Sequence, residues 1–455
     1  MKVVVIDDDP TGSQTVHDCP LLLHWDLLSL RFGLMNPAPL LFILANTRAL
    51  APQQAELRNR EICRALIEAL DAEQLSINDV IVVSRGDSTL RGHGVLEPMV
   101  IAQELGPFDA TFHVPAFLEG GRTTLNGVHC LHGEPVHLSP FAQDKLFGYS
   151  TSDLADWLEE KSSGFISSSQ VLRLNFRQLD QAIQPCGRVD QHGLSALIGW
   201  LERLGGNQPV VVDAERPEQL AVFGQAVRAL CGRKRFLFRS AASLLNGLSG
   251  QPPRLPSGAH LPLLRRQVGI NHRAPGLVVV GSHVPLADRQ LHELLQQPQC
   301  VGIELPVSKL ARVFEGGCPD LLLADLEEQW QQELGEVLAR DQTPVLFSSR
   351  GELSFASASA RLRFGTQLAE VMARLTAAVA DQLGYLICKG GITTHTVLET
   401  GLHLSSVDLK GQLLPGLSLV CAAMEAGADL PILTFPGNLG DQSTLRQAWS
   451  LMEAA

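Results

Sequence analysis

Three consecutive carboxylates follow the first apolar run of this chain. The run, Val3–Ile6, is β-branched throughout, and Asp7, Asp8 and Asp9 separate it from the turn residues Pro10–Ser13. A short run of this kind that ends in a turn predicts a buried strand. Ligands bind at the carboxyl ends of strands in open α/β sheets, and adjacent acids there require a cation, a hydroxyl-rich ligand or solvent. We therefore expect chemistry at this point, although acids also occur in turns for structural reasons.

A second polar block, residues 84–93, follows the apolar run Val80–Val83 and is rich in arginine, hydroxyl and glycine residues. Arginine binds planar carboxylates through paired hydrogen bonds, aspartate and serine suit sugar hydroxyls, and glycine lets backbone N–H groups approach a ligand. Arg48 and Arg122 follow two further apolar runs. Because parallel strands end at one edge of a sheet, these loops should bring their polar groups together. The alternative is a set of surface loops held by their own contacts.

Glycine-rich turns follow apolar runs in the second half of the chain as well. They contain Gly281 and Ser282, the segment Lys389–Thr394 and the segment Phe435–Asp441. Glycine turns that precede helices bind phosphate through backbone amides and the helix dipole, but they are also ordinary helix caps. Neither G-x-x-x-x-G-K-[ST] nor G-x-G-x-x-G occurs in the sequence. Together the turns favour a nucleotide site of a non-standard type.

Apolar runs alternate with amphipathic helical patterns, which predicts an α/β protein with two domains, each a mainly parallel sheet flanked by helices. The predicted strands are Val3–Ile6, Leu40–Ala45, Val80–Ser84, Ala110–Val114, Val210–Val212, Leu277–Val280, Gly302–Leu305, Val345–Phe347, Tyr385–Cys388, Leu417–Cys421 and Ile432–Phe435. The clearest predicted helices are Pro52–Leu70, Ser195–Leu204, Pro217–Leu230 and Phe364–Gln382. A chain of 455 residues exceeds one ordinary core. We expect domains at 1–245 and 276–455, joined by a linker at 246–275 that is rich in proline and glycine.

Composition narrows the class of protein. The chain is 45% hydrophobic and 18% charged, which is typical of a soluble globular protein. No apolar run approaches the ~20 residues of a membrane span, and no secretory signal is evident. Nine cysteines without a CxxC pair or zinc spacing indicate a reducing cytoplasm. His129 and His132 lack a third ligand, so we expect no protein-held metal there. The formal net charge of −12 argues against nucleic acid as a partner.

The chain resembles the four-carbon acid sugar kinases, a family long known as a domain of unknown function, whose members act on D-threonate, D-erythronate or 3-oxo-tetronates. The motifs that carry the resemblance are Asp8–Gly12, Asp87–Gly92, Pro115–Phe117, Gly121–Thr124, Asp213–Glu215 and Phe238–Ser243, then Gly281-Ser282, Gly390-Gly391 and Gly437–Gly440. They cover residues 1–245 and 275–447 approximately. The resemblance implies a sugar-acid-binding first domain and a nucleotide-binding second domain.

The chain departs from the family pattern at three places. Pro10 stands where many members have phenylalanine. Lys389 and Ile392 stand in a motif that is Ser-Gly-Gly-Glu-Thr in many members, so an acid near the phosphates is missing. Phe435 occupies a position that is often lysine. These changes suggest a subfamily with its own substrate or phosphate contacts, and they leave a loss of kinase activity open.

The resemblance implies phosphoryl transfer from ATP to a hydroxyl of a small acid sugar, with the terminal hydroxyl of a four-carbon tetronate as the expected acceptor. Asp8 or Asp9 would orient the acceptor hydroxyl and accept its proton, and Mg²⁺ would bridge the ATP phosphates. The residues expected to bind the acid sugar are Arg48, Arg85, Asp87, Ser88, Arg91, Gly92 and Arg122. The residues expected to line ATP are Ser282, Gly390, Gly391, Ile392, Thr393, Gly437, Asn438 and Gly440.

Two other functions stay open at this stage. The first is a catalytically degenerate protein that binds an acid sugar or a nucleotide, which the missing glutamate and lysine favour slightly. The second is a different enzyme on the same scaffold, such as an isomerase or hydrolase that uses the aspartates and a metal without a nucleotide. Tight ATP binding would count against an acid-sugar-binding protein without catalysis, and activity independent of ATP would indicate the different enzyme. We expect a cytoplasmic protein with no membrane or nucleic-acid partner, and we leave a homodimer open.

Overall fold

The computed structural model describes residues 1–254, 265–266, 273–316, 319–350, 355, 357–424 and 428–454. The chain divides into two compact units, Met1–Arg254 and Leu255–Ala455. Of the predicted linker 246–275, residues 246–249 are helical, and residues 255–264 and 267–272 lie outside the described part of the chain. The two units are described separately below.

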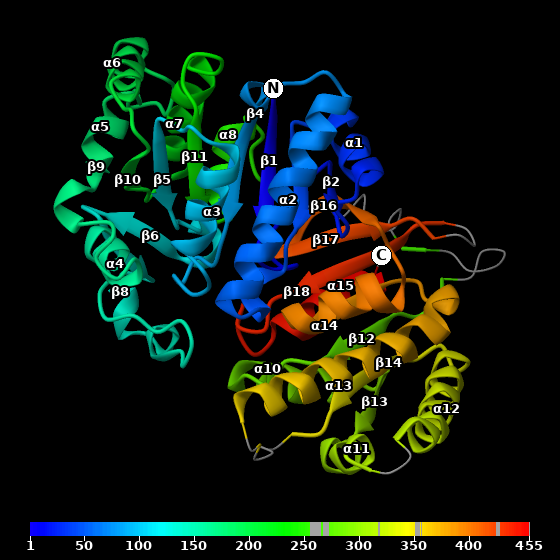
Figure 1. Ribbon diagram of the computed structural model, residues 1–455. Coiled ribbons are helices and arrows are strands. Elements are labelled where there is room, and N and C mark those ends of the chain that lie inside the picture. Colours follow the sequence, from blue (N-terminus) through cyan, green and yellow to red (C-terminus); the bar gives the residue numbers. More distant parts are fainter. Residues whose placement is uncertain are drawn as a thin grey trace. The chain divides into compact units, whose positions relative to one another are not determined.

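The first unit is built on a parallel sheet with the strand order β2-β3-β1-β4-β11-β5-β10-β9 (Figure 1). Its strands are β1 (Lys2–Asp7), β2 (Cys19–Leu22), β3 (Leu40–Leu44), β4 (Val80–Arg85), β5 (Ala110–Val114), β9 (Leu172–Leu174), β10 (Gln208–Val212) and β11 (Phe236–Ser240). A separate antiparallel sheet contains β6 (Arg122–Leu125), β7 (Val128–Leu131) and β8 (Glu134–Pro135). The parallel order confirms that the strands preceding the predicted site loops end at one edge of the sheet.

Helices cover both faces of this sheet. On one face, α1 (Leu27–Met35), α2 (Pro52–Ala72) and α3 (Leu96–Leu105) share a core with alternate residues of β1, β3 and β4. Helix α8 (Ala242–Ser249) packs against β1 and against α7 (Pro217–Ala229). The remaining helices of the unit are α4 (Leu154–Lys161), α5 (Phe176–Asp180) and α6 (Gln191–Glu202).

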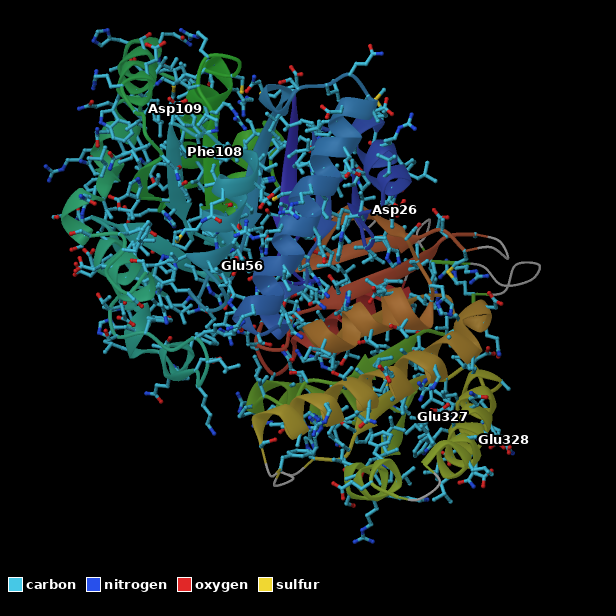
Figure 2. All side chains as sticks on the ribbon, viewed as in Figure 1. Asp26, Glu56, Phe108, Asp109, Glu327 and Glu328 are labelled. Atoms are coloured by element: carbon cyan, nitrogen blue, oxygen red, sulfur yellow. The ribbon has the colours of Figure 1, made fainter. Side chains whose placement is uncertain are left out.

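The sequence analysis did not predict strand β11, which lies between β4 and β5 in the sheet. Asp109, labelled in Figure 2, precedes β5 and holds the approach to β11, because its carboxylate accepts from Lys234 Nζ at 2.9 Å and from the Arg235 backbone N–H at 2.8 Å. In the pairing of β11 with β4, Arg239 lies beside Ser84. The result matters because Arg239 enters the site described below.

The second unit has the strand order β13-β14-β12-β15-β18-β17-β16. Its strands are β12 (Leu277–Val280), β13 (Cys300–Leu305), β14 (Thr343–Ser348), β15 (Leu386–Lys389), β16 (Ser406–Leu414), β17 (Leu417–Ala422) and β18 (Leu430–Phe435). The first five strands of that order are parallel, whereas β17 and β16 run antiparallel at one end. The expectation of a mainly parallel sheet is confirmed.

The helices of the second unit are α10 (Pro285–Leu294), α11 (Val307–Phe314), α12 (Pro319–Leu338), α13 (Ala358–Val379), α14 (Gly391–Thr396) and α15 (Thr444–Ala454). Helices α10 and α15 share a core with β12, β15 and β18. A π-helical turn, Val397–Gly401, follows α14. No helix within the described ranges is long and apolar enough to cross a membrane.

Candidate active site

Asp8 is the centre of an ion-pair cluster at the carboxyl edge of the first sheet. Its carboxylate lies 2.6 Å from Arg48 Nη2, 3.4 Å from Arg85 Nη1 and 3.7 Å from Arg239 Nη2. The side chain of Asp8 is 1% exposed, and those of Arg85 and Arg239 are also buried. Loops and strand ends of β1, β3, β4 and β11 supply these groups, so the sequence-based convergence of Asp8, Arg48 and Arg85 is a feature of the structure.

The neighbours of Asp8 have different environments. Asp7 is fully buried beside Arg85, and burial raises its pKa to about 7 despite that positive charge. Asp9 keeps 15% of its side chain exposed and lies 3.1 Å from Arg48. Burial alone would raise the pKa of Asp9, but Arg48 and the Thr11 hydroxyl outweigh it and lower the pKa. Asp9 is therefore the ionised acid of the three that is most open to a ligand.

Glu97 is a member of the cluster that sequence reasoning missed. Its carboxylate accepts hydrogen bonds from the Thr47 hydroxyl and from Arg239, and Arg239 also donates to Ser84 Oγ at 2.8 Å. Glu97 is 3% exposed although it lies in the first turn of α3. A glutamate at a helix start looks like an ordinary helix-dipole partner, so the sequence carried no signal for its role.

Asp87 and the arginines near it form the second part of the site. Asp87 accepts from Arg91 Nε at 2.8 Å and from the Thr89 hydroxyl at 2.5 Å. Burial would raise its pKa, but Arg91 and Arg48 lower the pKa strongly. Arg122 is 7% exposed and donates to a backbone carbonyl, and no carboxylate pairs with it among the described residues. Burial lowers the pKa of Arg122, with opposing effects from the charges of Asp87 and Arg91, so the cluster includes one buried arginine without an ion-pair partner among the described residues.

Two glycines allow this cluster to close. A Cβ atom at Gly86 would stand 2.1 Å from Arg239 Nη2. Gly92 has a φ of +88°, and a Cβ atom there would stand 3.1 Å from Asp8 Oδ2. Backbone without a side chain is therefore required at Gly86 for packing and at Gly92 for both packing and conformation.

Two residues that the sequence singled out, His129 and Asp213, serve the scaffold. His129 lies between the Ser88 carbonyl, 2.8 Å from Nε2, and the Thr124 hydroxyl, and burial lowers its pKa to about 4. Asp213 accepts from the backbone N–H groups of Asn126, Gly127 and Phe176 at 2.8–3.0 Å. His129 thus fixes the backbone of Ser88, whose own side chain is buried. No group of three or more His, Cys, Asp or Glu in metal-binding arrangement exists among the residues that the structure describes.

The glycine turns of the second unit meet at the carboxyl edge of its sheet. A Cβ atom would stand 1.9 Å from Thr393 Oγ1 if built at Gly281, and 2.5 Å from Ser282 Oγ if built at Gly437. Gly390 has a φ of +119° and lies against the Ser282 backbone nitrogen. Ser282, Gly390, Thr393 and Gly437 are therefore neighbours, as the sequence predicts.

A cavity of about 490 Å³ adjoins these turns. Its lining residues are Gly281, His283, Pro285, Asp288, Val307, Phe355, Arg361, Phe364, Gly365, Leu368, Ala369, Met372, Ile392 and Thr393. The mixture of aromatic, aliphatic and a few charged groups is typical of a small-molecule site. Of the predicted ATP residues, Ile392 and Thr393 line this cavity, while Gly391 begins α14 and Asn438 is half-buried. Gly440 has a φ of +81° and packs against Thr444, so its conformation serves the turn before α15.

Lys389 is a buried lysine that the sequence analysis places in a glycine-rich turn but does not assign to the nucleotide site. It ends β15, beside Phe435 of β18, and its Nζ lies 3.8 Å from the centre of that aromatic ring. Nζ also donates to the carbonyls of Pro436 at 3.1 Å and Gly437 at 3.3 Å. Burial, with a contribution from Arg350, lowers the pKa of Lys389 to about 7. A lysine therefore holds the third glycine turn from within the sheet.

Two family models match the two units. One describes a sugar-binding N-terminal domain and matches residues 3–248, and the other describes a nucleotide-binding C-terminal domain and matches residues 277–445. A D-erythronate kinase of Heliobacterium modesticaldum is 29% identical over 183 residues, a match that covers 38% of this chain and 39% of that protein. The chain thus aligns with well under half of this relative's length.

Solved structures share the fold. A protein of Salmonella typhimurium LT2, provisionally described as a tRNA synthase, matches with a TM-score of 0.64 and 16% identity, covering 98% of both chains. A Haemophilus influenzae protein assigned to DUF1537 matches with a TM-score of 0.58 and 16% identity, covering 99% of this chain and all of that one. These likenesses concern the fold and extend over both units.

Proposed function

The chain belongs to the four-carbon acid sugar kinase family, and on that premise we propose that it transfers the γ-phosphoryl group of ATP to a hydroxyl of a four-carbon sugar acid. The observation that carries the proposal is the buried cluster of arginines and aspartates at the edge of the first sheet. Such a cluster offers cations for a carboxylate and ionised acids for hydroxyls, which a short acid sugar carries together.

Arg122 is the group best suited to the substrate carboxylate. It is buried, and no acid among the described residues forms an ion pair with it. Arg91 lies close enough to act on its pKa, and 23% of the Arg91 side chain is exposed, so it can turn toward a ligand. A carboxylate between these two arginines would leave Asp87 and Ser88 for the hydroxyls. Charge-assisted bonds of this kind are about twice as strong as neutral ones.

Asp9 is the group best suited to the acceptor hydroxyl. Asp8 already contacts three arginines and its side chain is 1% exposed, whereas Asp9 pairs with one arginine and its side chain is 15% exposed. We assign Asp9 the task of orienting the hydroxyl and taking its proton as transfer proceeds. Asp8 then positions Arg48, Arg85 and Arg239. Phosphoryl transfer depends mainly on such positioning and on charge neutralisation.

The second unit would bind ATP in the 490 Å³ cavity and at the adjoining turns. The apolar wall formed by Phe364, Leu368 and Met372 suits a purine, and the turns at Ser282 and Gly390 suit phosphate oxygens. Mg²⁺ would enter with ATP and bridge its phosphates. Lys389 keeps the turn at Gly437 in place while the phosphates bind.

The test is ADP release from Mg·ATP in the presence of D- or L-threonate, D- or L-erythronate, or a 3-oxo-tetronate. We expect one acid to raise ADP release at least 100-fold above the rate without an acceptor. The variant Arg122→Met should raise the KM for that acid at least tenfold and leave the KM for ATP within twofold. Binding of ATP and of an acid without ADP release would instead favour the degenerate binding protein.

A further inference from the structure

Arg350 lies at the edge of the second sheet where the glycine turns meet. It follows β14, which is parallel to β12, and β12 in turn is parallel to β15. The carboxyl ends of these strands therefore face the same edge. Arg350 Nη1 donates to the Ser282 carbonyl at 2.7 Å, which ties the arginine directly to the first of the turns.

Most of the hydrogen-bonding capacity of Arg350 is unused. Nη1 also lies 3.1 Å from Asp288 Oδ1. Within the described part of the chain, neither Nε nor Nη2 has an acceptor, although both atoms are buried. A buried donor without a partner is destabilising because it has lost its hydrogen bonds to water. Both donors are thus available to an added acceptor.

Arg350 also acts on neighbouring basic groups. Its charge contributes to the lowered pKa of Lys389 and of His283, after the larger effect of burial on each. The acids that act on Arg350 itself are Asp288, whose side chain is 44% exposed, and Glu304. The positive charge of Arg350 therefore acts on the buried Lys389 beside turns whose backbone suits an anion.

We propose that Arg350 binds a phosphate group of the nucleotide, with Nε and Nη2 donating to phosphate oxygens while Nη1 stays on the Ser282 carbonyl. This inference rests on the proposed nucleotide site and adds to it a residue that binds the polyphosphate of the nucleotide. Arginine presents two parallel donors, which match a phosphate group better than a single ammonium group does. A bound phosphate would also neutralise the repulsion between Arg350 and Lys389.

The experiment compares ADP, tripolyphosphate and adenosine as ligands, measured by calorimetry or competition, for the wild type and for Arg350→Met. We expect the variant to bind ADP and tripolyphosphate at least tenfold more weakly and adenosine with unchanged affinity. Arg350→Lys should lie between the two proteins because it keeps the charge but loses the paired donors. The control variant is Arg340→Met. Arg340 is an exposed arginine that follows α12 and pairs with Glu336 of that helix, so this variant should bind all three ligands as the wild type does.

Unchanged ADP affinity in Arg350→Met would overturn the proposal, and so would an equal loss of adenosine and ADP, because that pattern indicates a role in turn structure. The thermal unfolding midpoint of each variant shows whether the fold is intact. If the wild type binds ADP through Arg350 but no acid sugar stimulates ADP release, the proposed kinase function fails and this inference stands. If the wild type binds neither ADP nor tripolyphosphate, both fail.

Discussion

At the scale of residues, neighbouring aspartates that look alike in sequence have separate environments. Asp7 is buried with one arginine, Asp8 is surrounded by three, and Asp9 reaches the surface of the cluster. Burial and the number of nearby cations decide the state of each acid. Sequence spacing cannot separate these cases, because the arginines come from positions about 40 to 230 residues away.

Because Asp8 and Asp9 have different roles, replacing each with asparagine should affect a different quantity, stability for Asp8 and catalysis for Asp9. Asp9→Asn should lower kcat by about 100-fold or more, in the range of general-base catalysis, with the free energy of unfolding nearly unchanged. Asp8→Asn should lower the free energy of unfolding by about 3 kcal/mol, because it leaves buried arginines without their acid. Coupled ADP-release assays and urea denaturation measure the two quantities. Equal stability losses in both variants would remove the distinction.

The buried carboxyl of Asp7 predicts a pH dependence of stability. Its pKa rises from an ordinary 3.8 to about 7 in the folded protein. Between about pH 4 and pH 7 the folded protein therefore keeps a proton that the unfolded chain releases, so the free energy of unfolding falls as the pH rises. Each pH unit in this window is worth up to about 1.4 kcal/mol.

Asp7→Asn removes that titration. The stability of the wild type relative to this variant should decline by up to about 4 kcal/mol from pH 4 to pH 7, measured by urea denaturation at several pH values. Parallel curves for the two proteins would show that Asp7 is ionised throughout.

At the scale of elements, hydrophobic runs predicted the strands that carry the site. The predictions for β1, β3, β4 and β5 are confirmed within one or two residues at each end. β11 was missed because Phe236–Ser240 ends in arginine and serine, which interrupt the apolar pattern. That omission also concealed the role of Arg239. The strands β6, β7 and β8 were missed because they are only two to four residues long and partly exposed.

The packing of Gly86 predicts a local effect on the loop after β4. In Gly86→Ala the new methyl group would overlap the Arg239 guanidinium, which Glu97 and Ser84 hold in place. Overpacking of this kind costs about 1–3 kcal/mol, and the affinity for the acid sugar should fall with it. Chemical denaturation and calorimetry measure both effects.

The matched control is Gly199→Ala in α6, where a Cβ atom would meet nothing within 4 Å. Alanine is favoured over glycine in a helix by about 1 kcal/mol, so this variant should be as stable as the wild type or more so. A Gly86→Ala protein as stable as Gly199→Ala would mean that the Arg239 side chain has room to move.

At the scale of the whole molecule, the two units divide the proposed chemistry between an acid-sugar site and a nucleotide site. The alternation of strands and helices indicated two α/β domains, and the family models match both. The sequence did not single out Glu97 or Arg350, because the contacts of each with the proposed sites are tertiary. Variants in one unit should therefore leave the ligand affinity of the other within about twofold, which calorimetry measures.

The most direct measurement of the central claim is the mass of the product formed from Mg·ATP and each four-carbon sugar acid. We predict that one acid gains a single phosphoryl group in a one-to-one ratio with ADP, and that Asp9→Asn forms neither product at a comparable rate. Conversion of an acid without consumption of ATP would contradict the claim. So would the absence of any phosphorylated acid from a protein that binds both ligands.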